Sequence, residues 1–287
     1  MWLAYAYGKI NLGLHVLERL PTGYHRIETG FCFIEWKDRF EVTQMDSYQL
    51  NLSNDSVPVD ESNLITQAYR TFEQYVGLKN HYRFNVTKHL PAGAGLGGGS
   101  SNAALTLRIL NKLEKSGLTD DELVDLSRPL GADISFFIKG KPGLGTGLGQ
   151  EIQPLDFQPD NWIVTVYPGF ESSTAEAYDH CQPNPDPEFP IRNVLLKDPV
   201  DEWQILLQND LEPPVIARHE LIGNIKDQLY EFGAEYASMS GSGSSVYGLF
   251  EQDFVALKAY EAFLDLEFKV NITRPNFKPD YGIYLKD

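Results

Sequence analysis

Five glycines fall within the seven residues 93–99, in a segment, Pro91–Ala104, that reads P-A-G-A-G-L-G-G-G-S-S-N-A-A. A backbone needs this much glycine where it turns tightly and approaches another group closely. Ser100 or Ser101 is the expected N-cap of a helix that runs to about Lys115. A glycine-rich turn that leads into a helix N-terminus presents backbone N–H groups and the positive end of the helix dipole. The segment therefore predicts a phosphate-binding site.

Two common phosphate motifs do not describe this loop. The Walker pattern requires Gly-Lys-Ser/Thr, and here Gly99 is followed directly by Ser100. The pattern G-x-G-x-x-G would open a βαβ unit with an acidic residue about twenty positions later, whereas Leu113–Glu114 falls inside the predicted helix. A flexible linker is the other alternative, but a linker would not lead directly into a strong helix that begins with small residues.

Asp133 is the one charged residue between Leu130 and Ile138, in the run L-G-A-D-I-S-F-F-I. A carboxylate so close to a core needs partners, because burying it unpaired costs several kcal/mol. It is either the N-cap of a helix or a catalytic base opposite Lys9. Alternation along a predicted strand, Leu3–His15, places Lys9 and Asn11 on one face. From spacing alone, this polar pair is either the decoration of an edge strand or part of a site.

Three segments together resemble the signatures of the GHMP kinases (galactokinase, homoserine kinase, mevalonate kinase and relatives). They are K-I-N-L-G-L from Lys9, the glycine loop, which follows P-x-x-x-G-L-G-S-S-x-A, and M-S-G-S-G within Ala237–Phe250. The loop is most similar to one branch of the family. That branch uses ATP to phosphorylate the 2-hydroxyl of a cytidine diphosphate-linked methylerythritol, in the non-mevalonate route to isoprenoid precursors. The resemblance implies that Lys9 lies beside a catalytic Asp133, in a stretch similar to the family's G-A-D-V-P-F-F, with Ser135 in place of the usual proline.

The same resemblance implies a nucleotide site, in which the glycine loop wraps the triphosphate and the third signature folds over the phosphates. Asn63 is implied near the adenine, at the start of a predicted helix, Ser62–Val76, that Ser62 or Asn63 caps. Lys88 ends a predicted strand, Tyr82–His89, and lies either close to the nucleotide or on the solvated surface. The implied ATP-binding residues are Asn63, Lys88, Pro91, Gly93, Ala94, Gly95, Leu96, Gly97, Gly98, Gly99, Ser100 and Ser101.

A turn marked by Pro21 and Gly23 carries Tyr24 and His25. Taken alone, such a pair is usually surface or core filler, but in the resembled branch this segment binds the cytidine. An aromatic ring can stack on a pyrimidine, and an imidazole can hydrogen-bond to its edge. A second glycine-rich loop, Gly140–Gly149, and the segment S-S-T-A-E-A-Y also carry residues over from the family. The implied substrate-binding residues are Asn11, Tyr24, His25, Leu148, Thr174 and Tyr178.

The order of predicted elements, β-β-β-α-β-loop-α-α followed by a second mixed set, indicates an α+β protein with two domains. Other expected elements are strands at Phe31–Val42, Tyr48–Leu52 and Trp162–Tyr167, and a helix at Thr119–Ser127 that opens with a capping box. The resemblance implies a two-domain GHMP kinase fold, with a ribosomal-protein-S5-like N-terminal domain over residues 1–153 and a ferredoxin-like C-terminal domain over 154–287. The active site is then expected between the domains.

The composition of the chain limits the kinds of partner that it is expected to bind. A net charge of −16 disfavours binding to nucleic acid or to an anionic membrane, which depends on a positive field. No apolar run approaches the roughly twenty residues of a membrane span, and the start of the chain lacks the pattern of a secretory signal. Cys32 and Cys181 are too few for a disulfide framework. We therefore expect a cytoplasmic enzyme with two free thiols, as a monomer or a homodimer.

An anionic protein must hold anionic ligands through a few cations, backbone N–H groups and a divalent metal. We expect Mg²⁺ to bridge oxygens of ATP, and since the sequence offers no obvious second acidic ligand, the metal ligands stay unassigned. Two alternatives stay open: another GHMP small-molecule kinase, of the homoserine or mevalonate kinase type, and a nucleotide-binding sensor without catalysis. The cytidine-binding segment disfavours the first alternative, and the presence of Asp133 with Lys9 disfavours the second.

Overall fold

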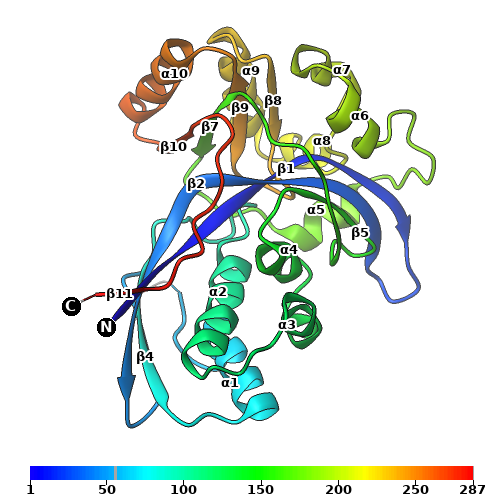
Figure 1. The fold of residues 1–287 in the computed structure, drawn as a ribbon. Coiled ribbons are helices and arrows are strands. Elements are labelled where there is room, and N and C mark those ends of the chain that lie inside the picture. Colours follow the sequence, from blue (N-terminus) through cyan, green and yellow to red (C-terminus); the bar gives the residue numbers. More distant parts are fainter. Residues whose placement is uncertain (55–56, 287) are drawn as a thin grey trace.

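Two β-sheets organise the chain in a computed structural model that describes residues 1–54 and 57–286 (Figure 1). Within these residues the first sheet has seven strands, in the order β11-β1-β2-β4-β3, with β5 beside β2 and β6 beside β5. Its pairings are antiparallel except for β3 with β4. The strands are β1 (Trp2–Arg19), β2 (His25–Met45), β3 (Gln49–Leu52), β4 (His81–Thr87), β5 (Gly143–Thr146), β6 (Glu151–Pro154) and β11 (Tyr284–Leu285).

The hairpin of β1 and β2 is the longest feature of the first sheet (Figure 1). Both strands extend beyond the predicted ranges at each end, and β1 is buried without interruption over residues 6–16. Register shifts interrupt their pairing between Tyr7 and Lys9 and again between Leu12 and Leu14. Such bulges bend a strand and change the direction of its side chains. Here they flank the segment that carries Lys9 and Asn11.

Four helices pack with the first sheet and form its core: α1 (Leu64–Val76), α2 (Gly98–Leu113), α3 (Asp120–Ser127) and α4 (Ile134–Lys139). The caps predicted at Asn63 for α1 and at Thr119 for α3 are confirmed, the second as a full capping box. The predicted start of α2 is wrong. Gly97, with a φ of 68°, is its N-cap, so the left-handed turn begins the helix at Gly98 and it ends at Leu113.

The second sheet has the order β10-β7-β9-β8, and all its pairings are antiparallel. Its strands are β7 (Trp162–Tyr167, as predicted), β8 (Tyr236–Met239), β9 (Val246–Phe250) and β10 (Lys269–Thr273). Helices α9 (Glu220–Glu231) and α10 (Asp253–Asp265) pack against it. Numbered along the chain, the strand order is 4-1-3-2, and this arrangement confirms the ferredoxin-like half of the predicted fold. Short helices between β7 and α9 complete this half: α5 (Thr174–His180), α6 (Ile191–Lys197), η1 (Val200–Glu202), α7 (Trp203–Leu206) and α8 (Glu212–Ile216).

A shared core joins the two halves. It places Ile10 and Leu12 of β1 against Trp203, Tyr247 and Leu249 from the second half. The end of the chain returns to the first sheet, where β11 pairs with the start of β1 (Figure 1). The division at residues 153/154 stays a prediction. It falls within β6, which pairs in the first sheet.

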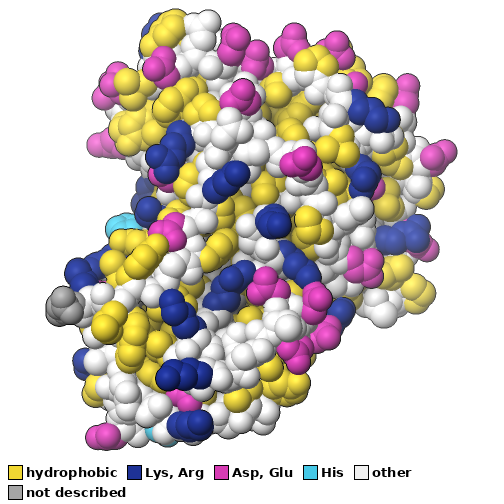
Figure 2. All heavy atoms as spheres, in the orientation of Figure 1, with side chains coloured by type: hydrophobic (Ala, Val, Ile, Leu, Met, Phe, Trp, Pro, Cys, Tyr) yellow, Lys and Arg dark blue, Asp and Glu magenta, His cyan; other side chains and the backbone are white. Residues whose placement is uncertain are grey.

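The surface and the thiols agree with the charge and cysteine content of the sequence. Figure 2 shows acidic side chains along the upper part of this face, over the second sheet and its helices. Across the described residues, the helices are too short or too polar to cross a membrane. Cys32 and Cys181 are both free, and burial raises the pKa of Cys32 to about 12. Cys32 is thus a core residue rather than a reactive one.

Candidate active site

Lys9 on β1 and Asp133 before α4 face each other, with 3.6 Å between Nζ and Oδ2. The Lys9 ammonium is almost fully buried, and it donates hydrogen bonds to the carbonyl oxygen of Gly95, at 2.9 Å, and to Oδ1 of Asn11. Burial lowers the pKa of Lys9, while the charge of Asp133 and its hydrogen bond oppose that shift. The two residues therefore lie opposite each other, as the sequence predicts.

Asp133 does not act as a helix cap. It occupies the N-cap position of α4, but its carboxylate makes no capping hydrogen bond, and its side chain is 33% exposed. The carboxylate instead lines a cavity that it shares with Lys9. Ser135, at the position of the family's proline, has its Oγ 2.9 and 2.8 Å from the carbonyl oxygens of Ala132 and Gln150, which share its single hydroxyl proton. This contact ties down the segment around Asp133 without a proline.

The side chain of Asn11 is oriented by its neighbours. Its Nδ2 donates to Oγ1 of Thr29 at 2.9 Å, which leaves Oδ1 to accept from Lys9. Its backbone is held from the second sheet, because the N–H donates to Oγ of Ser240 at 3.2 Å and the carbonyl accepts from the hydroxyl of Tyr247 at 2.7 Å. Asn11 thus fixes Lys9 from one side, and Gly95 fixes it from the other.

The first glycine loop and the third signature meet at Gly95. This residue has a φ of 76°, and a Cβ added to it would lie 2.1 Å from the carbonyl oxygen of Ser240. Oγ of Ser240 donates to the carbonyl oxygen of Gly95 at 2.9 Å, and the N–H of Ser245 donates to that of Ala94 at 3.1 Å. Only glycine fits here, since two backbone turns share the space. The juxtaposition that the resemblance implied is therefore present.

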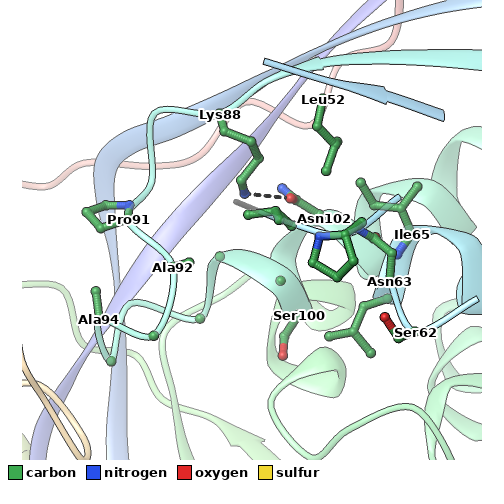
Figure 3. Close-up of a pocket in the computed structure, with 18 residues that line it drawn as sticks. Leu52, Ser62, Asn63, Ile65, Lys88, Pro91, Ala92, Ala94, Ser100 and Asn102 are labelled. Atoms are coloured by element: carbon green, nitrogen blue, oxygen red, sulfur yellow. Dashed lines mark hydrogen bonds between the residues drawn. The ribbon is translucent and has the colours of Figure 1, made fainter. Parts of the chain in front are cut away.

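A cavity of about 420 Å³ lies between the glycine loop, the end of β4 and the start of α1 (Figure 3). It is lined by every predicted ATP-binding residue except Leu96 and Ser101. Leu96 packs in the shared core, and Oγ of Ser101 donates to the carbonyl oxygen of Tyr7 at 2.6 Å, so these two side chains face away from the cavity. The remaining lining residues are mostly apolar, namely Leu52, Val57, Pro58, Leu64, Ile65 and Ala92, together with the polar Ser62 and Asn102.

Two of the lining residues have structural partners as well. Asn63 caps α1 through Oδ1, which accepts from the N–H of Ile65 at 2.8 Å. Lys88 is not a solvated surface lysine. Its ammonium is buried against Asp38 and Asn102, and it points along the cavity wall toward Asn102 in Figure 3. Neither partner was predicted from the sequence, because Asp38 stands between Lys37 and Arg39 and carries no signal that distinguishes it from a surface residue of a strand.

A second cavity, of about 300 Å³, holds the Lys9–Asp133 pair and adjoins the first. The two share Gly93, Gly95 and Gly97 as lining residues. The other walls come from β1, β2, the turn between β5 and β6, α5, the residue before α8 and the third signature: Asn11, Leu14, Ile27, Phe31, Leu148, Thr174, Tyr178, Leu211, Gly241, Ser242 and Gly243. A hydroxyl held here can therefore lie close both to a base and to phosphates on the glycine loop.

A third cavity continues from the second past Leu148, Thr174 and Tyr178, which line both. Its remaining walls are Gly23, Tyr24, His25, Ala175 and Asp179, so the predicted substrate-binding residues gather along the second and third cavities. The rings of His25 and Tyr178 stack with centroids 5.0 Å apart and an angle of 21° between their planes. Burial and the charge of Arg19 lower the pKa of His25, so its imidazole is neutral near pH 7.

The structure offers few metal ligands. In the described ranges, no group of three His, Cys, Asp or Glu side chains is placed to hold a metal ion. Asp133 is the one carboxylate among the described residues that line the second cavity. Because Mg²⁺ usually keeps several waters and binds through substrate phosphates and one or two carboxylates, this donor set fits a metal carried mainly by a nucleotide.

Comparisons with known proteins agree with this geometry. Models of the GHMP kinases N terminal domain and the GHMP kinases C terminal domain match residues 63–141 and 195–267. The chain is 38% identical to the 4-diphosphocytidyl-2-C-methyl-D-erythritol kinase of Chlorobium phaeobacteroides (strain BS1), over 95% of this chain and 96% of that one. It is also similar to a crystal structure of 4-(cytidine 5'-diphospho)-2C-methyl-D-erythritol kinase, with a TM-score of 0.82, 30% identity and 94% and 98% of the chains covered. A homoserine kinase from Cytophaga hutchinsonii ATCC 33406, with a TM-score of 0.71, 16% identity and 98% and 97% covered, shares the fold alone.

Proposed function

The chain belongs to the GHMP kinases and, within them, to the 4-diphosphocytidyl-2-C-methyl-D-erythritol kinases. From this premise we propose how its site binds the two substrates and positions them for phosphoryl transfer. It transfers a phosphoryl group from ATP to its cytidine diphosphate-linked alcohol, in the non-mevalonate route to isoprenoid precursors. The first cavity takes the adenosine of ATP, and the glycine loop takes the triphosphate. The third cavity takes the cytosine, and the second takes the methylerythritol with its 2-hydroxyl beside Asp133.

One observation carries this proposal: the Lys9–Asp133 pair lies where the nucleotide cavity and the second cavity share the glycine loop. Phosphoryl transfer needs little covalent work from the protein, so positioning and charge stabilisation are the main requirements. Asp133 accepts or orients the proton of the attacking hydroxyl. Lys9 holds Asp133 in place and offsets the charge of the γ-phosphate, with two of its N–H groups already fixed by Gly95 and Asn11.

We include Mg²⁺ in the proposal as an ion that arrives with ATP. Of the described residues, Asp133 is the carboxylate that could contribute to its coordination in the second cavity. When bound, the ion would offset the charge of the triphosphate, as in other phosphoryl transfers. The same charge is offset on the protein side by Lys9 and by the backbone N–H groups at the start of α2.

The third cavity favours a cytidine substrate over a small alcohol such as homoserine or mevalonate. Those alcohols carry no base, whereas this cavity holds an aromatic ring, a neutral imidazole and the exposed ring of Tyr24. A catalytically inactive sensor is disfavoured by the intact pair of Lys9 and Asp133. The site therefore favours phosphoryl transfer to an acceptor that is linked to a nucleoside.

A turnover assay tests the proposal directly. The purified chain is mixed with ATP, Mg²⁺ and 4-diphosphocytidyl-2-C-methyl-D-erythritol, with homoserine and mevalonate as alternative acceptors in parallel reactions. We expect ADP release only with the cytidine compound and phosphorylation of its 2-hydroxyl, located by phosphorus–proton NMR. Equal turnover with homoserine or mevalonate would refute the assignment of the third cavity. Absence of turnover with every acceptor would support the sensor.

A further inference from the structure

A buried ion pair underlies the wall of the nucleotide cavity. Asp38 on β2 is fully buried, with 0% of its side chain exposed, and it bonds to the ammonium of Lys88, whose side chain is 8% exposed. Asp38 lies in the first sheet and Lys88 directly follows β4 of that sheet, 50 positions apart in the sequence. Burying two charges is costly, and apolar residues of similar size often serve stability as well or better. The pair therefore calls for an explanation beyond stability.

Every oxygen of Asp38 is used. Its Oδ1 accepts from the backbone N–H groups of His89 and Leu90, at 2.7 and 2.9 Å. Its Oδ2 accepts from the Lys88 ammonium and from Nδ2 of Asn102, the latter at 2.9 Å. Asn102 in turn accepts from Lys88 through Oδ1, at 2.7 Å (Figure 3). The ammonium is thus held at one point by two acceptors that are themselves fixed.

The held ammonium faces the nucleotide cavity. Lys88 and Asn102 both line it, and Nζ of Lys88 lies 3.8 Å from the position that a Cβ on Gly98 would occupy. The ammonium is therefore beside the first residue of α2, where the helix presents its free N–H groups. Of its three N–H groups, two are used by Asp38 and Asn102, and the third has no partner among the residues that the structure describes.

We propose that Asp38 is a positioning residue for ATP that acts through Lys88, by fixing the ammonium so that its third N–H donates to the nucleotide. This inference rests on the assignment of the first cavity to ATP. Asn102 has the same kind of role, because it holds the ammonium from the second side. A purely structural role for Asp38, in which it only ties the backbone at 89–90 before the glycine loop, is the competing explanation.

Calorimetric titration with Mg·ATP separates the two roles, and it does not depend on turnover. Lys88→Met should weaken ATP binding about tenfold to a hundredfold, the usual effect of losing a hydrogen bond from a charged donor. Asp38→Asn should weaken it to a similar extent. The decisive comparison is the double variant Asp38→Asn/Lys88→Met with Lys88→Met alone, because neither contains an ammonium at this position. Lys88→Met leaves the buried Asp38 carboxylate with three N–H donors but no cation, so Tm is recorded for both variants to show that they are folded. If Asp38 acts through Lys88, their Kd values for ATP agree within about twofold.

Three results would overturn the inference. One is a normal Kd for ATP in Lys88→Met. Another is a further large rise in Kd when Asp38→Asn is added to Lys88→Met, since that identifies the backbone as the target. The third concerns a matched control, Glu114→Gln, which removes the charge of another buried carboxylate. Glu114 lies at the opposite end of α2, and a helix of 16 residues is about 24 Å long. We expect a lower Tm and an unchanged Kd for ATP; an equal loss of ATP binding there would mean that any destabilisation has this effect.

Failure of this inference can be told apart from failure of the proposed reaction. If the wild-type chain binds ATP but phosphorylates no acceptor, the proposed function fails while the titrations still decide the role of Asp38. If the wild-type chain is an active kinase and Lys88→Met binds ATP normally, the proposed function stands and the inference on Asp38 fails. The KM for the cytidine substrate gives a last check, because it should not change in any of these variants.

Discussion

Replacing Asp133 by Asn should abolish most turnover and leave the protein folded. The lost pair with Lys9 is 3.6 Å long and open to solvent on the Asp133 side, where 33% of the side chain is exposed, but the Lys9 ammonium is buried, so we expect its loss to lower stability moderately. Lys9 keeps its hydrogen bonds to Gly95 and Asn11 in the variant. Loss of a general base costs about 10²–10⁴ in rate, or about 2.7–5.5 kcal/mol in the barrier. The fall in kcat is therefore compared with Tm in the same variant, so that loss of the base is distinguished from loss of folded protein.

The assay measures kcat by ADP release with saturating ATP and cytidine substrate, alongside Tm and the Kd for ATP. We expect kcat to fall at least a hundredfold, Tm to change by a few degrees at most, and Kd to stay near the wild-type value. Asp121→Asn is the matched control, because Asp121 also pairs with a lysine, Lys139, but on the outer surface. A wild-type kcat in Asp133→Asn, or an equal loss of kcat in Asp121→Asn, would refute the assignment of Asp133 as the base.

Further predictions concern the cytosine cavity, the glycine loop and a buried histidine. Tyr178→Ala should raise the KM for the cytidine substrate about tenfold and leave the KM for ATP unchanged, since stacking contributes about 1–3 kcal/mol per base; equal shifts in both KM values would contradict the assignment. Gly95→Ala should lower the free energy of unfolding by about 3 kcal/mol or more, because its Cβ would lie 2.1 Å from a backbone oxygen at a φ of 76°. Gly99→Ala, whose closest contact is a side-chain carbon at 3.2 Å, should fold and bind ATP about tenfold more weakly, as denaturant unfolding and ATP titration can test. Burial lowers the pKa of His15, but the hydrogen bond to Asp210 and the charge of that carboxylate outweigh it, so the pKa is raised above 6.5. The stabilisation that protonated His15 provides is complete below pH 6.5 and is lost as the pH rises through the raised pKa. Urea unfolding should find this decrease of stability with pH in the wild type and not in His15→Asn.

The sequence predicts the parts of the site that follow from local motifs. Short sequence patterns mark the glycine loop, the strand with Lys9 and Asn11, and the turn with His25. Each pattern indicates a physical role without a structure. Leu96 and Ser101 belong to the same glycine motif, yet their side chains point into the core and toward β1. A motif locates a backbone turn, but the direction of each side chain depends on where the following helix begins, and Gly97 begins it early.

Residues that act through distant partners could not be predicted in this way. Asp38 stands in the segment W-K-D-R-F, where it resembles a polar residue on the exposed face of a strand. Its burial follows from the approach of Lys88 and Asn102, which lie 50 and 64 positions later. The stack of His25 on Tyr178 also joins two separate segments, one at the start of β2 and one in α5. The contacts of Asp38 are fixed by packing within the first half, and the stack of His25 on Tyr178 is fixed by the packing of the two halves. The sequence carries no local pattern for either.

Contacts between the two halves hold the part of β1 that carries Lys9 in place. Asn209 holds the third signature in place, because its Nδ2 donates to the carbonyl oxygens of Met239 and Gly241, each at 2.8 Å. The same turn binds the backbone of Asn11 through Ser240, and Asn11 fixes the ammonium of Lys9. The position of Lys9, on the first sheet, thus depends on contacts made by the second. Because charge stabilisation in phosphoryl transfer falls off when a cation is displaced, the proposed role of Lys9 requires both halves to hold it beside Asp133.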